Sequence, residues 1–136
     1  MDNGMECDGD EHQELAVKDP DSERPIPMAW RGTIKAIVQI LAQSDIQSNA
    51  GLTGVRPVSA ETAQQIQKYL ESYGAELVEL PEETWQSSVC IWTGSGWDAL
   101  IDLWTAAEGR SDLVLSLQVT ESQDGFEFGI NMVYVP

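Results

Sequence analysis

The pattern that most constrains the fold is an alternation of apolar and polar side chains that runs from residue 97 to residue 135. Alternation with a period of two is typical of a β-strand with one buried face. Residues 97–104, 113–120 and 126–135 are therefore predicted to be strands, after an earlier strand at 89–93. Turn residues separate each pair of strands, so we predict an antiparallel meander of about four strands.

The alternation also predicts which side chains face the core. One face would be almost entirely apolar: Trp97, Ala99, Ile101, Leu103, Leu113, Leu115, Leu117, Val119, Phe126, Phe128, Ile130, Met132 and Tyr134. The opposite face would be mixed: Asp98, Leu100, Asp102, Trp104, Val114, Ser116, Gln118, Thr120, Glu127, Gly129, Asn131 and Val133. Such a face is either a solvated surface whose indoles cover the sheet edge or a surface that receives a partner, because tryptophans with polar surroundings are frequent at binding hot spots.

Two amphipathic helices are predicted before the strands. Residues 28–43 carry the apolar stripe Trp30, Ile34, Ile37, Val38 and Leu41. The second helix begins after Ser59, ends at Gly74 and carries the stripe Ala63, Ile66, Tyr69, Leu70 and Tyr73. The prediction is an α+β fold in which two N-terminal helices pack on one face of the sheet. The 44–58 connection is long, so it is either a functional loop or contains a missed short element.

The chain divides by composition into an acidic tail and one domain. The first 25 residues contain nine acidic and two basic side chains and little that is apolar, so residues 1–27 are expected to be disordered or loosely docked. The apolar patch Leu15-Ala-Val could fasten the tail to the domain. Residues 28–136 are predicted to form a single α+β domain.

The net charge of −16 restricts the possible partners. Nucleic acids and anionic membranes would be repelled, so we expect neither to bind. Residues 1–8 lack the basic and apolar regions of a secretory signal, and no apolar run is long enough to span a membrane. Cys7 and Cys90 are interpreted as free thiols, which predicts a cytoplasmic protein. The acidity either maintains solubility or steers the protein toward a basic partner.

The side chains that most chemistry requires are missing from the predicted domain. The only histidine, His12, lies in the tail, and Cys90 has no cationic neighbour in sequence that would activate it. Asp98 and Asp102 would be about 13 Å apart on one strand face, too far for a glycosidase pair. The turn that contains Gly94 lacks the lysine of a phosphate loop. We therefore predict a protein that is not an enzyme and that needs no cofactor or metal.

The turn between the predicted strands 97–104 and 113–120 carries more polar side chains than a connection needs. Glu108, Gly109, Arg110, Ser111 and Asp112 are crowded there. They could satisfy one another, with Gly109 supplying an unusual backbone conformation, Arg110 bridging to Glu108 or Asp112, and Ser111 or Asp112 capping free amides. They could instead face a partner. Under that second interpretation, the candidate partner-binding residues are Asp98, Asp102, Trp104, Glu108, Arg110 and Asp112.

Trp97, the run Asp102-Leu-Trp-Thr and the run Glu108-Gly-Arg-Ser-Asp-Leu resemble a family of small uncharacterised bacterial domains, over about Trp30 to Val135. The resemblance implies domain limits and a bacterial origin, but no catalytic residues. In size and charge the chain is also similar in general character to bacterial toxin-immunity proteins. The sequence thus predicts a non-catalytic protein-binding domain, such as an immunity-type inhibitor of a basic toxin. A small ligand-binding module or enzyme that uses the 44–58 loop and the mixed face, or a self-assembling structural protein, are the alternatives, and the oligomeric state stays open.

Overall fold

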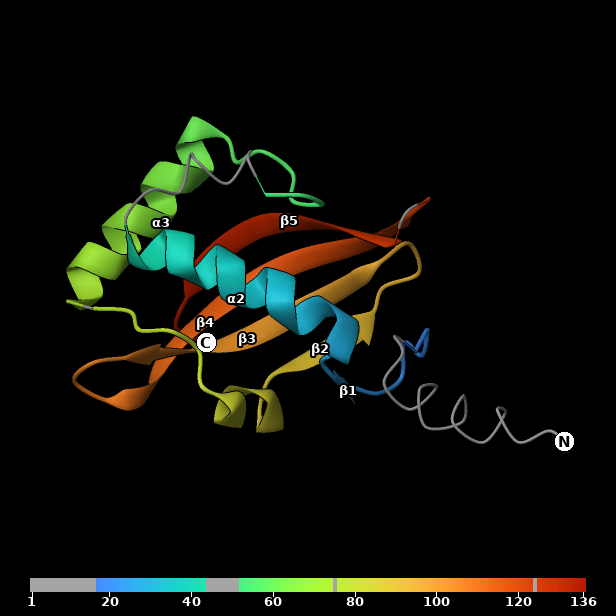
Figure 1. Cartoon of the computed structure of the whole chain (residues 1–136), viewed down its shortest axis with the longest axis horizontal. Helices are drawn as coiled ribbons and strands as arrows, with labels where there is room; N and C mark the ends of the chain where they lie inside the picture. Colours follow the sequence, from blue (N-terminus) through green and yellow to red (C-terminus); the bar gives the residue numbers. More distant parts are fainter. Residues whose placement is uncertain (1–16, 44–51, 75, 124) are drawn as a thin grey trace, which may run out of the picture.

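A five-stranded antiparallel sheet in meander order β1-β2-β3-β4-β5 forms the centre of the structure (Figure 1). This computed structural model describes residues 17–43, 52–74, 76–123 and 125–136. The strands are β1 (Arg24–Pro25), β2 (Val89–Trp92), β3 (Trp97–Thr105), β4 (Gly109–Ser122) and β5 (Gly125–Tyr134). The predicted α+β fold with an antiparallel meander is confirmed, and β1 is the strand that the sequence pattern did not predict.

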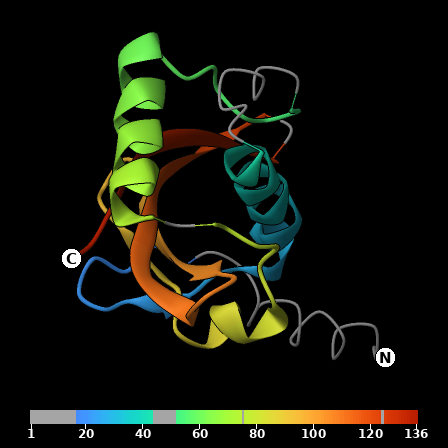
Figure 2. The same cartoon turned by 90° about the vertical axis from the view of Figure 1, so that its left-hand side faces the viewer.

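Both predicted helices are present. Helix α2 (Met28–Ala42) lies across one face of the sheet, whereas α3 (Ala60–Tyr73) runs beside β5 (Figures 1 and 2). The expected caps hold α3, because Ser59 Oγ accepts a hydrogen bond from the Thr62 N–H and Gly74 adopts a φ of 76°. A short 3-10 helix, η2 (Glu82–Gln86), precedes β2. In the described part of the chain, no helix has the length and apolar character needed to cross a bilayer.

An aromatic cluster joins α2 to the sheet. Trp97 in β3 is 1% exposed, and its ring meets the ring of Trp30 edge to face at a centroid distance of 5.5 Å. Phe126 and Phe128 of β5 pack on Trp30 in the same way, at 5.4 and 6.1 Å. These edge-to-face contacts add about 0.5–1.5 kcal/mol each to the burial of the rings. The predicted core residues of α2 and β3 are confirmed as buried.

The N-terminal part of the described chain lies against this cluster. Trp97 Nε1 donates a hydrogen bond to the backbone oxygen of Val17 at 3.0 Å. Lys18 Nζ lies 5.1 Å from the centroid of the Trp92 ring and 2.9 Å from a carboxylate oxygen of Glu121. Residues from Val17 onward therefore contact the domain, within the region that the sequence analysis assigned to the tail. Residues 1–16, which include most of the predicted fastening patch, lie outside the described residues.

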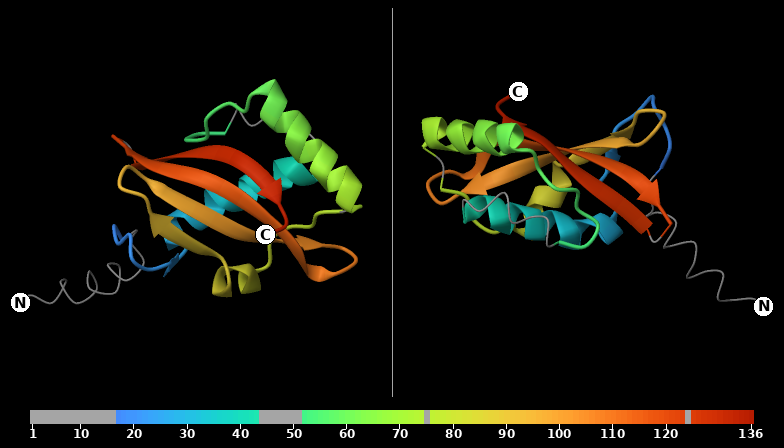
Figure 3. Two further views of the ribbon diagram at one scale, coloured as in Figure 1. Left: turned by 180° about the vertical axis from the view of Figure 1, so that it is seen from behind. Right: turned by 90° about the horizontal axis from the view of Figure 1, so that it is seen from above.

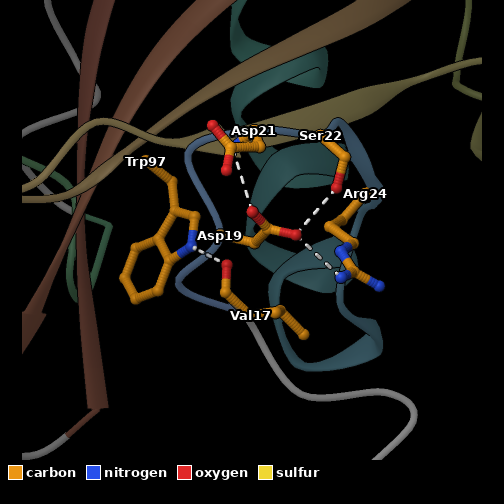
Figure 4. Close-up of polar contacts among 6 residues, drawn as sticks. All are labelled: Val17, Asp19, Asp21, Ser22, Arg24 and Trp97. Atoms are coloured by element: carbon orange, nitrogen blue, oxygen red, sulfur yellow. Dashed lines mark hydrogen bonds and ion pairs between the residues drawn. The ribbon is translucent and has the colours of Figure 1, made fainter.

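A turn around Asp19 leads this segment into β1 (Figure 4). The Asp19 carboxylate accepts hydrogen bonds from the Asp21 N–H at 2.9 Å, from Ser22 Oγ at 2.9 Å and from the Arg24 guanidinium at 3.0 Å. These contacts, the Asp21 N–H first, lower the pKa of the Asp19 carboxyl group. Arg24 then pairs with Cys90, which places β1 at the edge of the sheet.

A bulge in β5 changes which of its side chains face the core. Ser116 pairs with Met132, but Leu117 pairs with Ile130, so Asn131 is an extra residue that reverses the alternation. Val133 is fully buried and Met132 is 40% exposed. The prediction was wrong for this end of β5: Met132 and Tyr134 share the face of Ser116 and Val114, opposite the core, and Val133 belongs to the core.

Loops and side chains cover the sheet edges in the described residues. Within the 44–58 connection, Val55 bridges to Phe128 on the outer edge of β5, which is the kind of short element that the long loop allowed. Residues 44–51 of that connection lie outside the described residues. Within residues 76–80, Leu77 forms an isolated bridge to Thr105 of β3. At the other edge, β1 is two residues long and ends at Pro25, which has no N–H to donate.

Two glycines provide a matched test of this packing. A Cβ at Gly96 would lie 2.6 Å from the backbone oxygen of Val119, whereas one at Gly32 in α2 would have no atom within 4 Å. Gly96→Ala is expected to destabilise the domain by about 1–3 kcal/mol, because the backbone of β4 must move. Gly32→Ala is expected to stabilise it by about 0.5–1 kcal/mol through helix propensity. Urea unfolding of both variants measures the two changes, and equal effects would contradict this packing.

Candidate functional site

The face of the sheet opposite α2 carries most of the residues predicted to bind a partner. Figure 3 (left) shows β2 to β5 from this side, with no described helix lying across them. We call this surface the open face and define it by the side chains that alternation and pairing place there: Val89, Ile91, Asp98, Leu100, Asp102, Trp104, Arg110, Asp112, Val114, Ser116, Gln118, Thr120, Glu127, Met132 and Tyr134. Five of the six predicted partner-binding residues belong to it. Glu108 does not.

The Glu108 carboxylate turns toward α3. Tyr73 donates its hydroxyl hydrogen to Glu108 Oε1 at 2.8 Å, and Thr105 Oγ1 lies 3.4 Å from the same oxygen. The Glu108 N–H in turn donates to Thr105 Oγ1 at 3.1 Å, which closes the turn between β3 and β4. The hydrogen bond to Glu108 raises the pKa of the Tyr73 phenol, because it favours the protonated form. Glu108 therefore joins α3 to the hairpin.

Asp102 is partly occupied by contacts within the fold. Ser87 Oγ donates a hydrogen bond to Asp102 Oδ2. Thr84 Oγ1 donates to the Asp102 backbone oxygen at 2.7 Å, and the Asp102 N–H donates to Ser88 Oγ at 3.0 Å. Side chains from η2 and the residues after it thus take the place of a neighbouring strand at this point of the β3 edge. The carboxylate is half-buried and held in one orientation, with Oδ1 still able to accept a hydrogen bond.

The side chain of Ser111 stabilises a register shift between β3 and β4. Asp102 pairs with Val114 and Trp104 pairs with Arg110, so β4 has two more residues than β3 between these pairs. The buried Ser111 Oγ donates to the Leu103 backbone oxygen at 2.8 Å and accepts from the Leu113 N–H at 3.1 Å. Ser111 is therefore structural, as the local interpretation of this turn predicted, and Gly109 has the expected positive φ of 74°.

Arg110 and Asp112 project from this irregular segment and are exposed. The ion pairs found between described residues include neither of them, so the predicted bridge from Arg110 to Glu108 or Asp112 is not formed there. A hollow of about 480 Å³ lies beside them. Its lining comes from the sheet and from the end of the chain: Asp102, Arg110, Ser111, Asp112, Val114, Val135 and Pro136.

A second hollow, of about 500 Å³, lies on α3 and shares Val135 with the first. Tyr69 and Tyr73 line it, and Tyr69 Oη accepts the Val135 N–H at 3.1 Å. Both tyrosines belong to the predicted apolar stripe of the helix and are not among the predicted partner-binding residues. Tyr69 and Tyr73 lie four residues apart and therefore share one face of α3. That spacing could have indicated a binding surface, but core residues of a helix have the same spacing, so the pattern does not distinguish the two.

The described residues offer little nucleophilic or metal-binding chemistry. Cys90 is buried, and desolvation raises the pKa of its thiol to about 11, which keeps it protonated near neutral pH. No group of three or more His, Cys, Asp or Glu side chains in the described part of the chain could hold a metal ion. The arrangement on the open face is suited to binding: carboxylates, one guanidinium and an indole stand among half-buried apolar side chains.

Comparison with known families identifies a match over most of this domain. Residues 38–136 match DUF7668, a domain of unknown function. The chain belongs to this family. The matched range begins inside α2, whereas the described structure also places Trp30 and β1 in the same core and sheet. No characterised protein and no solved structure matches the chain.

Removing the Ser111 hydroxyl tests the structural role of this residue. Ser111→Ala is expected to lower the free energy of unfolding by about 1–3 kcal/mol, because the buried Leu103 oxygen and the Leu113 N–H lose their partner. Urea unfolding followed by tryptophan fluorescence measures the loss. Ser72→Ala, on the exposed side of α3, is the control and should change stability by no more than about 0.5 kcal/mol. Equal effects of the two substitutions would show that the serine does not stabilise the register shift.

The contact between Tyr73 and Glu108 can be tested by titration. In the Glu108→Gln variant the Tyr73 pKa is expected to fall toward its ordinary value, because the carboxylate that favours the protonated phenol is gone. Ultraviolet difference spectra from pH 8 to pH 12 report tyrosine ionisation, and Tyr73→Phe identifies the signal of this residue. An unchanged Tyr73 titration in Glu108→Gln would rule out the contact in solution.

Proposed function

We propose that this domain is a non-catalytic protein-binding domain whose open face binds a basic protein. One observation carries the proposal: Asp98, Asp102 and Asp112 stand without ion pairs, among the described residues, on a sheet face that no described helix covers. Four basic residues of the domain are already engaged by other acids, in the pairs Lys18–Glu121, Arg24–Asp19, Lys35–Glu82 and Arg56–Glu127. Of the residues that define the open face, only Arg110 is basic, so three aspartates against one arginine leave this face with a net negative charge for an external cation.

Charge and anchoring would have different roles in this interaction. The net charge of −16 would attract a basic protein over a distance of about 10 Å at 0.1 M salt and so accelerate association. Trp104, half-buried and opposite Arg110, would supply the apolar contact that slows dissociation. Such a complex should weaken as salt rises, because Asp112 is exposed and Asp98 and Asp102 are only half-buried, so salt screens their charges.

The specific form that we propose is an immunity-type inhibitor, cytoplasmic and bacterial, of a basic toxin such as a nuclease. A nuclease site attracts phosphates, and carboxylates held on a rigid sheet can take the same place. The support comes from the size and acidity of the chain and from its resemblance to small bacterial domains. This support is a general similarity in size and charge, and it identifies no binding residue beyond those of the open face.

The two alternative functions have less support. Self-assembly by strand pairing needs a free sheet edge, and the described edges of β1, β3 and β5 are short or covered. A ligand-binding module would use the hollow beside Arg110 and Asp112, which is about 480 Å³ in volume. The 44–51 part of the loop proposed for that module lies outside the described residues.

The proposal is tested with the tagged full chain recovered from its host at low and high salt. The expected partner is a basic protein that elutes as salt rises. Asp98→Asn with Asp112→Asn is expected to weaken its binding about three- to tenfold, since rim charges contribute modestly to affinity. Glu61→Gln with Glu71→Gln on exposed sites of α3 removes the same charge and should change affinity less than twofold. An acidic partner, or one indifferent to both salt and the open-face variant, would refute the proposal.

A further inference from the structure

The open face contains one continuous row of side chains across four strands. The pairings Val89 with Leu100, Leu100 with Ser116 and Ser116 with Met132 place these residues side by side. Three of the four are apolar. Met132 is 40% exposed, and the other three residues are half-buried. Because neighbouring strands lie about 4.8 Å apart, the row is about 14 Å long and runs perpendicular to the strands.

Two carboxylates flank this row. Asp98 and Asp102 lie two residues before and two residues after Leu100 on β3, so they share its face at about 7 Å on either side. Beyond Asp102, the hollow lined by Arg110, Asp112 and Val114 continues the same flank. The row therefore has one β3 carboxylate on each side of Leu100, beside apolar or neutral side chains of the neighbouring strands such as Ile91 and Val114. Its long direction crosses the strands.

We propose that the open face binds a basic amphipathic helix of the partner, lying across the strands along this row. The inference rests on the proposed function and specifies the partner segment. A helix with its side chains is about 10–12 Å wide, which fits between carboxylates about 13 Å apart. A row of about 14 Å corresponds to about nine residues of helix. The segment would present apolar residues at i, i+3 or i+4 and i+7 to Leu100 and Met132, with Lys or Arg on both flanks.

Other occupants fit this surface less well. A second copy of the chain would bring together two molecules that each carry a charge of −16. An extended strand needs a free edge, but Gly54 and Arg56 form backbone hydrogen bonds with Phe128 on the outer edge of β5, at 2.7 and 2.8 Å. Gln65 Nε2 donates to the Val133 oxygen further along the same edge, at 3.2 Å. A helix needs no backbone partner and can lie directly on side chains.

Three synthetic peptides of about 18 residues, long enough to form isolated helices, test the inference against the full chain. The first has leucines along one helical face and lysines on both flanks. The second has the same composition in scrambled order, and the third has glutamates in place of the lysines. Fluorescence anisotropy of labelled peptides gives the dissociation constants. The amphipathic basic peptide is expected to bind at least about tenfold more tightly than either control.

Substitutions in the row locate the contact. Leu100→Gln and Met132→Gln are each expected to weaken binding of the amphipathic basic peptide about three- to tenfold, and Met28→Gln serves as the control. Met28 is 59% exposed at the start of α2, on the covered side of the sheet, and its substitution should have no effect. Because Met132 is exposed, its variant tests the row even if Leu100→Gln impairs folding.

If the basic and scrambled peptides bind equally, the helix inference fails while the basic-partner proposal stands. If no basic peptide binds, both fail.

Discussion

Burial of a single face of the sheet is the constraint on which the rest of the structure depends. Helix α2 and the aromatic cluster around Trp97 fill that face, and no described helix lies across the opposite face. Two register shifts then decide what the open face carries. Without the extra residue Asn131, Met132 would point into the core and Val133 would be exposed. Without the extra residues that Ser111 stabilises, Arg110 would not lie opposite Trp104.

Much of this architecture could be predicted because it depends on local periodicity. The stripe on α2 from Trp30 to Leu41 has the period of a helix, and every member of it is buried. Ser59 and Gly74 marked the ends of α3 because capping depends on neighbours within four residues. In β3 the strict alternation from Trp97 to Thr105 gave the correct faces, since no bulge interrupts that strand. The structure confirms the fold class that these local features predicted.

The features that were missed depend on contacts between distant parts of the chain. Strand β1 is two residues long and contains a proline, so no local pattern marks it, and only its pairing with β2 defines it. The sequence around Asn131 alternates equally well in either register, and the pairing with β4 chooses one. Glu108 was grouped with its sequence neighbours, but its carboxylate is bound by Tyr73, which lies 35 residues earlier. Asp102 was assigned to a partner, yet Ser87 already binds its side chain.

Methionine oxidation tests most directly whether the open face is the working surface. Met132 lies on that face and Met28 lies on α2, and both are exposed enough to react in the free protein. Hydroxyl-radical oxidation of the full chain, with and without the basic partner, is quantified for each residue by mass spectrometry. The account predicts that the partner protects Met132 several-fold and leaves Met28 unchanged. Protection of Met28 alone, or of neither residue in a saturated complex, would contradict it.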